Sequence, residues 1–249
     1  KLSTPQGYVY VGQWDKGEKQ GKGIITFADG TVYDGEFAGD TRQGKGKLTM
    51  PNGLTYDGEW QGGQISGQGK LTEPNGDSYD GSFAEGLRQG QGTATFANGD
   101  RYQGGYQADK RQGKGKFTAK DGSGYDGDWV ASHMQGQGTM TYVDGAVYQG
   151  GFKDDRPDGQ GKITYADGSS YEGAWVAGAI QGAGKTTYVD GSTYEGTFKA
   201  GRAEGQGKLT AKDGYVYDGT WRLGQREGQG RATYADGTVY EGGFVNGLR

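Results

Sequence analysis

The chain has 249 residues, and only 31% of them are hydrophobic, so a thick core between two layers of secondary structure is not expected. Glycine contributes 55 residues, but 4 prolines against 18 Tyr, 8 Phe and 5 Trp argue against a disordered linker. The net charge of −4 gives no basic field for nucleic acid, and the lack of cysteine excludes disulfides and thiol chemistry. No apolar run is long enough for a transmembrane segment. We expect a soluble chain whose compartment stays open: cytoplasm or periplasm, with or without peripheral attachment to a membrane.

The predicted elements follow a 23-residue repeat that runs along the chain without insertion or deletion. Residues 1–7, KLSTPQG, match residues 47–53, KLTMPNG, so the chain opens in the second half of a unit. From residue 10 each unit begins with Tyr, has Gly two residues later and an aromatic residue four residues later. This period of two predicts a strand. The repeat tyrosines are Tyr10, Tyr33, Tyr56, Tyr79, Tyr102, Tyr125, Tyr148, Tyr171, Tyr194, Tyr217 and Tyr240.

A second strand is predicted after a variable loop in each unit. It begins with G-x-G, continues with a polar and usually an apolar residue, and ends with Thr before an Asp-Gly or Asn-Gly turn. Each unit is therefore predicted to be a β-hairpin. Ten complete units occupy residues 10–239, with partial units at 1–9 and 240–249, and together they form one continuous array. Because repeat arrays normally carry polar caps, we expect this array to be excised from a longer protein.

Charge pairs set the predicted register between units. Asn-Gly often forms a two-residue turn, but a three-residue turn ending with Gly76 in the left-handed conformation places Lys70 opposite Asp80 and Leu71 opposite Tyr79. Opposite charges recur at the equivalent positions, and where the basic residue is Thr its partner is a neutral Gln, as directly opposed side chains should behave. Nine of eleven junctions follow this rule. The two that do not are Ile24 with Asp34 and Lys1 with Val11.

This register predicts one aromatic face and one ionic face for the sheet. The aromatic face carries the repeat tyrosines, the Trp or Phe four residues later, an aliphatic position and further rings such as Phe96, Tyr142 and Tyr165. The ionic face carries Thr and the charge pairs. Glycine in the strands leaves room for neighbouring rings to lie over the backbone, which accounts for a residue that otherwise weakens a strand.

The pattern Y-x-G-x-W-x-x-G-x-x-x-G-x-G-x-x-x-x-x-D-G resembles the MORN repeat from Tyr10 to Gly247. The resemblance implies an all-β fold: an elongated, single-layer antiparallel β-meander of tandem 23-residue hairpins. A sheet of some 20 strands would form a twisted rod on the order of 100 Å long, whose coiling wraps the aromatic face into a groove. Four units depart from the pattern because the Gly three residues after the second ring is replaced, which leaves their loop shape open. The replacements are Asp40, Asp109, Ser132 and Asp155.

The sequence predicts no catalytic, metal-binding or cofactor-binding residues, and we expect no enzyme activity in this segment. Residues 179–187 and 39–46 have some likeness to a phosphate-binding loop, but their glycines belong to the repeat and no helix follows. His133, the single histidine, is interpreted as a solvent-exposed loop residue, because partners for a metal or a catalytic triad are missing. Acidic residues recur in every unit, whereas a catalytic pair would stand alone.

The aromatic face is the predicted binding site, because one layer of structure cannot bury a long apolar face completely. We expect it to receive a protein partner or a second copy of the chain, and the family resemblance implies scaffolds that organise assemblies near membranes and in some cases dimerise. Alternatives are phospholipid headgroups, a role proposed for the family, glycans on the aromatic platforms, or a targeting arm for an enzyme domain outside this segment. The predicted groove residues are Tyr102, Tyr106, Tyr125, Trp129, Tyr148, Phe152, Tyr171 and Trp175.

Overall fold

The computed structural model describes residues 1–5 and 7–249, so Gln6 in the first partial unit lies outside the described residues. The described chain contains strands and turns and no helix, and no helix that could cross a membrane is found there. The strands are β1 (Leu2–Ser3), β2 (Val9–Asp15), β3 (Glu18–Thr26), β4 (Val32–Ala38), β5 (Thr41–Thr49), β6 (Thr55–Gln61), β7 (Gln64–Thr72), β8 (Ser78–Ala84), β9 (Leu87–Thr95), β10 (Arg101–Gln107), β11 (Lys110–Thr118), β12 (Gly124–Val130), β13 (His133–Thr141), β14 (Val147–Lys153), β15 (Arg156–Thr164), β16 (Ser170–Val176), β17 (Ala179–Thr187), β18 (Thr193–Lys199), β19 (Arg202–Thr210), β20 (Val216–Arg222), β21 (Gln225–Thr233) and β22 (Val239–Phe244).

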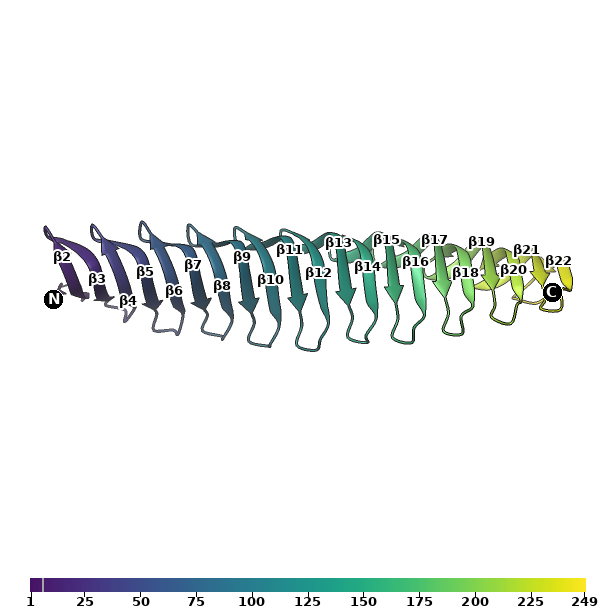
Figure 1. The fold of residues 1–249 in the computed structure, drawn as a ribbon, viewed down its shortest axis with the longest axis horizontal. Coiled ribbons are helices and arrows are strands. Elements are labelled where there is room, and N and C mark those ends of the chain that lie inside the picture. The colour runs from purple at the N-terminus through teal and green to yellow at the C-terminus, as the bar shows by residue number, and fades with distance from the viewer. Residues whose placement is uncertain (6) are drawn as a thin grey trace. The chain divides into compact units, whose positions relative to one another are not determined.

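Within each part of the chain, consecutive strands pair as antiparallel hairpins, as β6, β7, β8 and β9 do (Figure 1). Two compact units can be distinguished. The first contains residues 1–120 and 129–132, and the second contains residues 121–128 and 133–249. Within each unit the chain folds as an open meander of consecutive hairpins. The expected all-β class, built from tandem antiparallel hairpins, is confirmed.

The predicted register between hairpins is confirmed. Lys70 lies opposite Asp80 and Leu71 lies opposite Tyr79 in the pairing of β7 with β8. The turn between these strands has Gly76 at a φ of +94°, and the backbone N–H of Glu73 donates a hydrogen bond of 2.8 Å to the carbonyl of Asp77. The three residues inside this closing hydrogen bond include the left-handed glycine that the sequence required.

Asp or Asn before the turn glycine has a structural role that recurs along the chain. The side-chain oxygen accepts a hydrogen bond from the backbone N–H two residues later, an Asx turn that holds the chain as it reverses. In the turn above, Asn75 Oδ1 accepts from the Asp77 N–H at 2.9 Å. The same bond is made by Asp29, Asn52, Asn98, Asp121, Asp144, Asp167, Asp190, Asp213 and Asp236.

The segment expected to be a variable loop is mostly strand, so that expectation is wrong. In the hairpin of β6 and β7, Gln61 pairs with Gln64 and only Gly62 and Gly63 form the turn, with φ angles of +57° and +81°. Two consecutive left-handed residues match the right-handed twist of the flanking strands, which makes this turn compact. The residues that vary between units therefore lie on strands, where their faces are fixed by alternation.

A bulge interrupts each of these hairpins, and the sequence analysis did not anticipate it. In β6 and β7 the pairing of Gly58 with Gly69 is followed by that of Trp60 with Ile65, so extra residues of β7 oppose a single position of β6. Gly67, the first glycine of G-x-G, lies in this bulge with a φ of +89°. A left-handed glycine is the usual device for such an irregularity, which explains why the repeat keeps this glycine as well.

The tyrosine hydroxyls and rings form the buried layer of the sheet. Tyr56 is fully buried, and its hydroxyl donates a hydrogen bond of 2.9 Å to the carbonyl of Glu59. A Cβ atom added at Gly69 would lie 2.3 Å from the Tyr56 hydroxyl, so only glycine fits beneath the ring. In the other complete 23-residue repeats, a Cβ atom added at the equivalent glycine would also collide with the tyrosine of that repeat. The predicted role of the strand glycines, space for rings, is confirmed.

Candidate functional site

The eight predicted groove residues are all buried. Their exposed fractions run from 0% for Tyr102 and Tyr148 to 7% for Trp175. Within each unit these rings meet edge to face, as Tyr102 does with Trp129 at a centroid distance of 5.4 Å and an interplanar angle of 89°. Edge-to-face contacts between aromatic rings are favourable beyond the area they bury. In each unit these residues therefore form a packed floor of the aromatic face, and their role in binding remains a prediction.

Most polar side-chain atoms of the floor make hydrogen bonds to backbone carbonyls. Trp129 Nε1 donates to the Gly115 carbonyl at 2.9 Å, and the Tyr148 hydroxyl donates to the Gly151 carbonyl at 3.0 Å. Burial raises the pKa of several tyrosines to about 12. The floor therefore offers a partner few free polar groups.

Two rows of side chains border the floor on the aromatic face. The turn-side row lies five residues after the second ring of each 23-residue repeat. Its residues pair with that ring across the hairpin, as Arg42 does with Phe37. The loop-side row follows the Thr that ends each second strand, as Phe27 follows Thr26. The turn-side row is Lys19, Arg42, Ile65, Arg88, Arg111, Met134, Pro157, Ile180, Ala203, Arg226 and Arg249. The loop-side row is Phe27, Met50, Glu73, Phe96, Ala119, Tyr142, Tyr165, Tyr188, Ala211 and Tyr234.

Sequence reasoning missed the turn-side row, although it placed three rings of the loop-side row on the correct face. The signal was present in the 23-residue period, because cations occupy equivalent positions of successive units. The recurring cations were overlooked because these positions were assigned to a variable loop. In the structure the guanidinium carbon of Arg42 lies 4.3 Å from the Trp60 ring centroid, and that of Arg111 lies 4.7 Å from the Trp129 centroid. These distances are within the range of cation–π attraction.

Hollows lie between the rows in both units. One of about 400 Å³ in the first unit is lined by Lys19, Phe27, Phe37, Asp40 and Arg42 together with Tyr8, Ile25, Thr41 and Gly63. Another of about 330 Å³ in the second unit is lined by Tyr165, Tyr188, Ile180, Phe198 and Trp221 with Tyr171, Thr186, Tyr194, Gly201, Arg202, Ala203 and Gly224. The two differ in charge, since the first holds Arg42 and a Lys–Asp pair while rings dominate the second.

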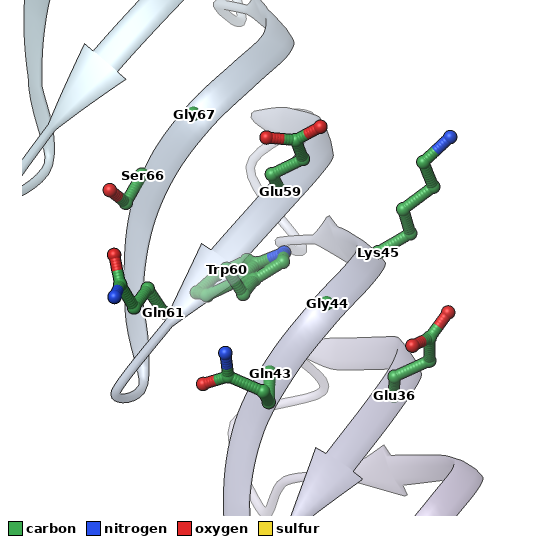
Figure 2. A pocket seen from close by; sticks show the side chains of 9 residues that line it. All are labelled: Glu36, Gln43, Gly44, Lys45, Glu59, Trp60, Gln61, Ser66 and Gly67. Atoms are coloured by element: carbon green, nitrogen blue, oxygen red, sulfur yellow. The ribbon is translucent and has the colours of Figure 1, made fainter.

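The opposite face carries a polar hollow of about 510 Å³ in the first unit, shown in Figure 2. Glu36, Lys45 and Glu59 border it, and Trp60 lies between the strands. Glu59 Oε2 accepts a hydrogen bond of 3.2 Å from the Gln68 N–H, so this carboxylate supports the bulge. Within the described residues no group of three potential metal ligands is found. We therefore interpret this hollow as part of the structural framework of the sheet.

The ionic face is more regular than the sequence analysis proposed. Asp57 lies opposite Lys47 on one side and Lys70 on the other, and Lys70 in turn lies opposite Asp80. Charges thus alternate along a row that crosses several strands. Lys162 and Glu172 approach to 3.7 Å, and Arg231 and Glu241 to 3.4 Å. Alternating signs leave no extended patch of one charge on this row, which does not favour an anionic lipid surface.

His133 does not lie in a loop, which corrects that part of its interpretation, because it is the first residue of β13. Its side chain is 60% exposed, as expected, and its Nδ1 lies 2.7 Å from Asp155 Oδ2. Residues 179–187, considered for phosphate binding, form strand β17, where Lys185 lies opposite Glu172 and Glu195. A strand does not supply the helix N-terminus of a phosphate loop, so that possibility is not supported.

These features define a tandem β-hairpin repeat protein in which packed aromatic rings cover one face of the sheet. The family model described as MORN repeat matches residues 10–32, 33–55, 56–78, 79–101, 102–124, 125–147, 148–170, 171–193, 194–214, 217–239 and 240–249. The chain belongs to the MORN-repeat family, and the phase of the matches is the one deduced from the tyrosines. No curated protein matches the chain in sequence.

Solved structures with some similarity to the chain were found at low sequence identity. One is the TCP10 domain of Danio rerio CPAP in complex with a peptide of Danio rerio STIL: it is 14% identical, with 98% of this chain and 100% of that chain covered and a TM-score of 0.37. Another is the SAS-4 (dCPAP) TCP domain of Drosophila melanogaster with a proline-rich motif of Ana2, 15% identical, with 71% and 90% covered and a TM-score of 0.39. A streptogramin B lyase structure is 13% identical, with 98% and 81% covered and a TM-score of 0.17.

Proposed function

We propose that this chain is a non-enzymatic scaffold that binds an extended segment of a protein partner on its aromatic face. The observation that carries the proposal is the exposure of large rings beside a hollow: Tyr165 is 39% exposed and Tyr188 is 45% exposed, and both line the hollow of about 330 Å³. Tyrosine suits a binding surface because it offers a large, rigid contact area and one polar tip.

The spacing of the repeat supports an extended ligand. Equivalent positions in successive hairpins are two strands apart, which is about 9–10 Å at ordinary strand spacing. An extended peptide advances about 3.2 Å per residue, so every third side chain would meet an equivalent position of the sheet. A peptide lying across the strands could therefore repeat one contact in several hairpins, and weak contacts would add up along its length.

Phospholipid headgroups, glycans and a second copy of the chain are alternatives that the same surface must be tested against. The alternating charges of the ionic face argue for an apolar contact surface on the opposite side of the sheet rather than for an anionic bilayer. A targeting arm for an enzyme domain elsewhere in the protein is compatible with peptide binding, because such an arm also needs a docking surface.

The test is a selection of random displayed peptides on the immobilised chain, followed by measurement of the selected peptides in solution. The double variant Tyr165→Ala/Tyr188→Ala removes the exposed rings, and it should fold because Ala119 and Ala211 occupy the same row. The control Val176→Ala removes an apolar side chain that is 55% exposed at the end of a strand. We expect selected peptides to lose affinity for the double variant and to keep it for the control.

Two results would contradict the proposal. Peptides that bind the double variant as well as the original chain would place binding elsewhere. Failure to enrich any peptide, together with retention of a glycan or of phosphatidylserine vesicles, would favour the alternatives. Size-exclusion chromatography with light scattering across a concentration series would identify a second copy as the occupant.

A further inference from the structure

We infer that the aromatic face of the first unit selects peptides carrying two carboxylate side chains, one for Arg42 and one for Arg111. This inference rests on the proposed function and adds the chemistry of the ligand. It starts from a contrast between the units. The turn-side row carries Lys19, Arg42, Arg88 and Arg111 in the first unit, whereas the next four residues of the row are uncharged.

The four cations are not equivalent. Lys19 Nζ makes an ion pair with Asp40 at 2.6 Å, and Arg88 Nε pairs with Asp109 at 2.9 Å. Each of these charges is therefore neutralised by a residue of the next turn. For Arg42 and Arg111, in contrast, no carboxylate lies within ion-pairing distance among the residues that the structure describes. These two guanidinium groups keep a full positive charge on the aromatic face.

The donors of both groups are oriented but largely unused. Arg42 Nη2 donates one hydrogen bond of 2.8 Å to the Gly63 carbonyl. Arg111 has no such bond in the described chain, and its guanidinium carbon lies over Trp129 at 4.7 Å, Tyr102 at 5.2 Å and Phe117 at 5.7 Å. A guanidinium has five N–H donors in its plane, and stacking on a ring leaves that edge available. A carboxylate can accept two of these donors at once, which gives a strong and directional contact.

The surroundings favour a peptide over a bilayer. Both arginines are half-buried, and Arg42 lines the hollow of about 400 Å³ beside Phe27 and Phe37. A flat anionic surface would first meet the carboxylates of Asp40 and Asp109 in the turns, whose side chains are 50% and 42% exposed. A narrow chain can place its own carboxylate against Arg42 in the hollow, where the Asp40 carboxylate is already paired with Lys19. Charge complementarity therefore indicates an acidic peptide.

The repeat also fixes the spacing of the acidic residues. Arg42 and Arg111 lie three hairpins apart in the sequence, which corresponds to about 29 Å across six strands. An extended peptide covers that span in about nine residues. We therefore expect the preferred ligand to carry Asp or Glu at two positions about nine residues apart.

The experiment compares two fluorescein-labelled extended peptides that differ only at these two positions, Glu in one and Gln in the other. We expect the Glu peptide to bind at least about tenfold more tightly, because hydrogen bonds to a charged group are worth that much in affinity. Arg42→Ile and Arg111→Ile should each remove about tenfold of the affinity for the Glu peptide and leave that for the Gln peptide unchanged. Both variants should fold, since Ile65 and Ile180 occupy the same row.

A matched control is Arg226→Ile in the second unit, whose guanidinium is occupied by the Tyr215 hydroxyl and by the Gly247 carbonyl at 2.7 Å. This variant should leave the affinity for the Glu peptide unchanged. Equal binding of the Glu and Gln peptides, or binding of the Glu peptide to Arg42→Ile and Arg111→Ile as tight as to the original chain, would overturn the inference while the selection experiment above still decides the proposed function. Binding to phosphatidylserine vesicles without binding to the Glu peptide would overturn the peptide assignment.

Discussion

Each repeat tyrosine is held by its hydroxyl, by neighbouring rings and by the glycines beneath it. Tyr56 shows the arrangement: its ring meets Trp60 and Phe83 edge to face at 5.4 Å and 5.3 Å, and its hydroxyl donates to the Glu59 carbonyl. The ring lies over Gly58 and Gly69, where added Cβ atoms would collide with it. A side chain with this many fixed neighbours cannot move to admit a larger residue.

Gly69→Ala should therefore destabilise the chain. The new methyl group would lie 2.3 Å from the Tyr56 hydroxyl, and the ring is fully buried. Overpacking of this kind costs about 1–3 kcal/mol of unfolding free energy, which urea denaturation would measure. Gly243→Ala is the control, because the nearest atom to its added Cβ is the end of the Gln229 side chain at 3.9 Å. Equal losses for both variants would contradict the steric explanation.

The shifted tyrosines predict a loss of stability in alkali. Burial raises the pKa of Tyr56 from 10.0 to about 12, so the folded chain holds the phenolic proton more tightly than the unfolded chain does. This contribution is complete below about pH 10 and disappears as the pH rises through about 12. Urea midpoints should fall over that interval, with tyrosinate absorbance appearing together with unfolding.

Tyr56→Phe tests that assignment, because it removes one of the shifted phenols. The variant loses the hydrogen bond to Glu59 and should be less stable at neutral pH, but its stability should depend less steeply on pH between about 10 and 12 than that of the original chain. An unchanged slope would show that alkaline unfolding has another origin, such as the titration of lysine.

At the scale of the hairpin, the four replaced glycines keep the turn and add a contact. Asp40, Asp109, Ser132 and Asp155 have φ angles of +66°, +65°, +74° and +66°, in the same left-handed region as the glycines they replace. Each side chain accepts a hydrogen bond from a backbone N–H in the preceding hairpin, as Asp109 Oδ1 does from Arg88 N at 2.9 Å. The added bond offsets the strain of a non-glycine residue in this conformation.

Asp109→Ala and Asp109→Gly should separate the hydrogen bond from the strain. The Ala variant loses the bonds to Arg88 and keeps the left-handed backbone, so we expect a loss of about 1–2 kcal/mol in unfolding free energy. The Gly variant loses the same bonds without the strain and should be the more stable of the two. The control Gly86→Asp places a carboxylate at the same turn position of the previous hairpin and should be nearly neutral. A Gly variant less stable than the Ala variant would contradict this explanation.

The alternating charges on the ionic face predict an unusual response to charge reversal. Lys70 lies between Asp57 and Asp80, so Lys70→Asp creates repulsion on two sides, and adding Asp80→Lys relieves only one of them. The single variant should lower the melting temperature by about 2–4 °C at low salt and by less at high salt. Lys70→Gln, the neutral control, should have little effect because exposed pairs contribute little. Full restoration by the double variant would contradict the role of Asp57.

At the scale of the whole molecule, period and charge co-variation were sufficient to predict the hairpins, their register and the two faces. They were sufficient because alternation is a local property of a strand, and a pair such as Lys70 and Asp80 reports directly on the register. The bulge at Gly67 could not be predicted, since a left-handed glycine in a strand and one in a turn look alike in the sequence. The near-complete burial of Trp129 and Tyr148 was also not predicted, because burial of these rings depends on the side chains of the two rows that border them.

The pairing pattern has a consequence for how such chains change over evolutionary time. In the described pairings each hairpin exchanges backbone hydrogen bonds with the hairpins next to it, so an in-frame duplication of one complete 23-residue repeat inserts a piece whose two edges match the edges already present. No distant partner has to adapt. A single inserted residue within a strand, by contrast, would exchange the faces of every ring downstream in that strand. Gene-level gain and loss should therefore occur in whole units, and homologues should differ in repeat number more readily than in repeat length.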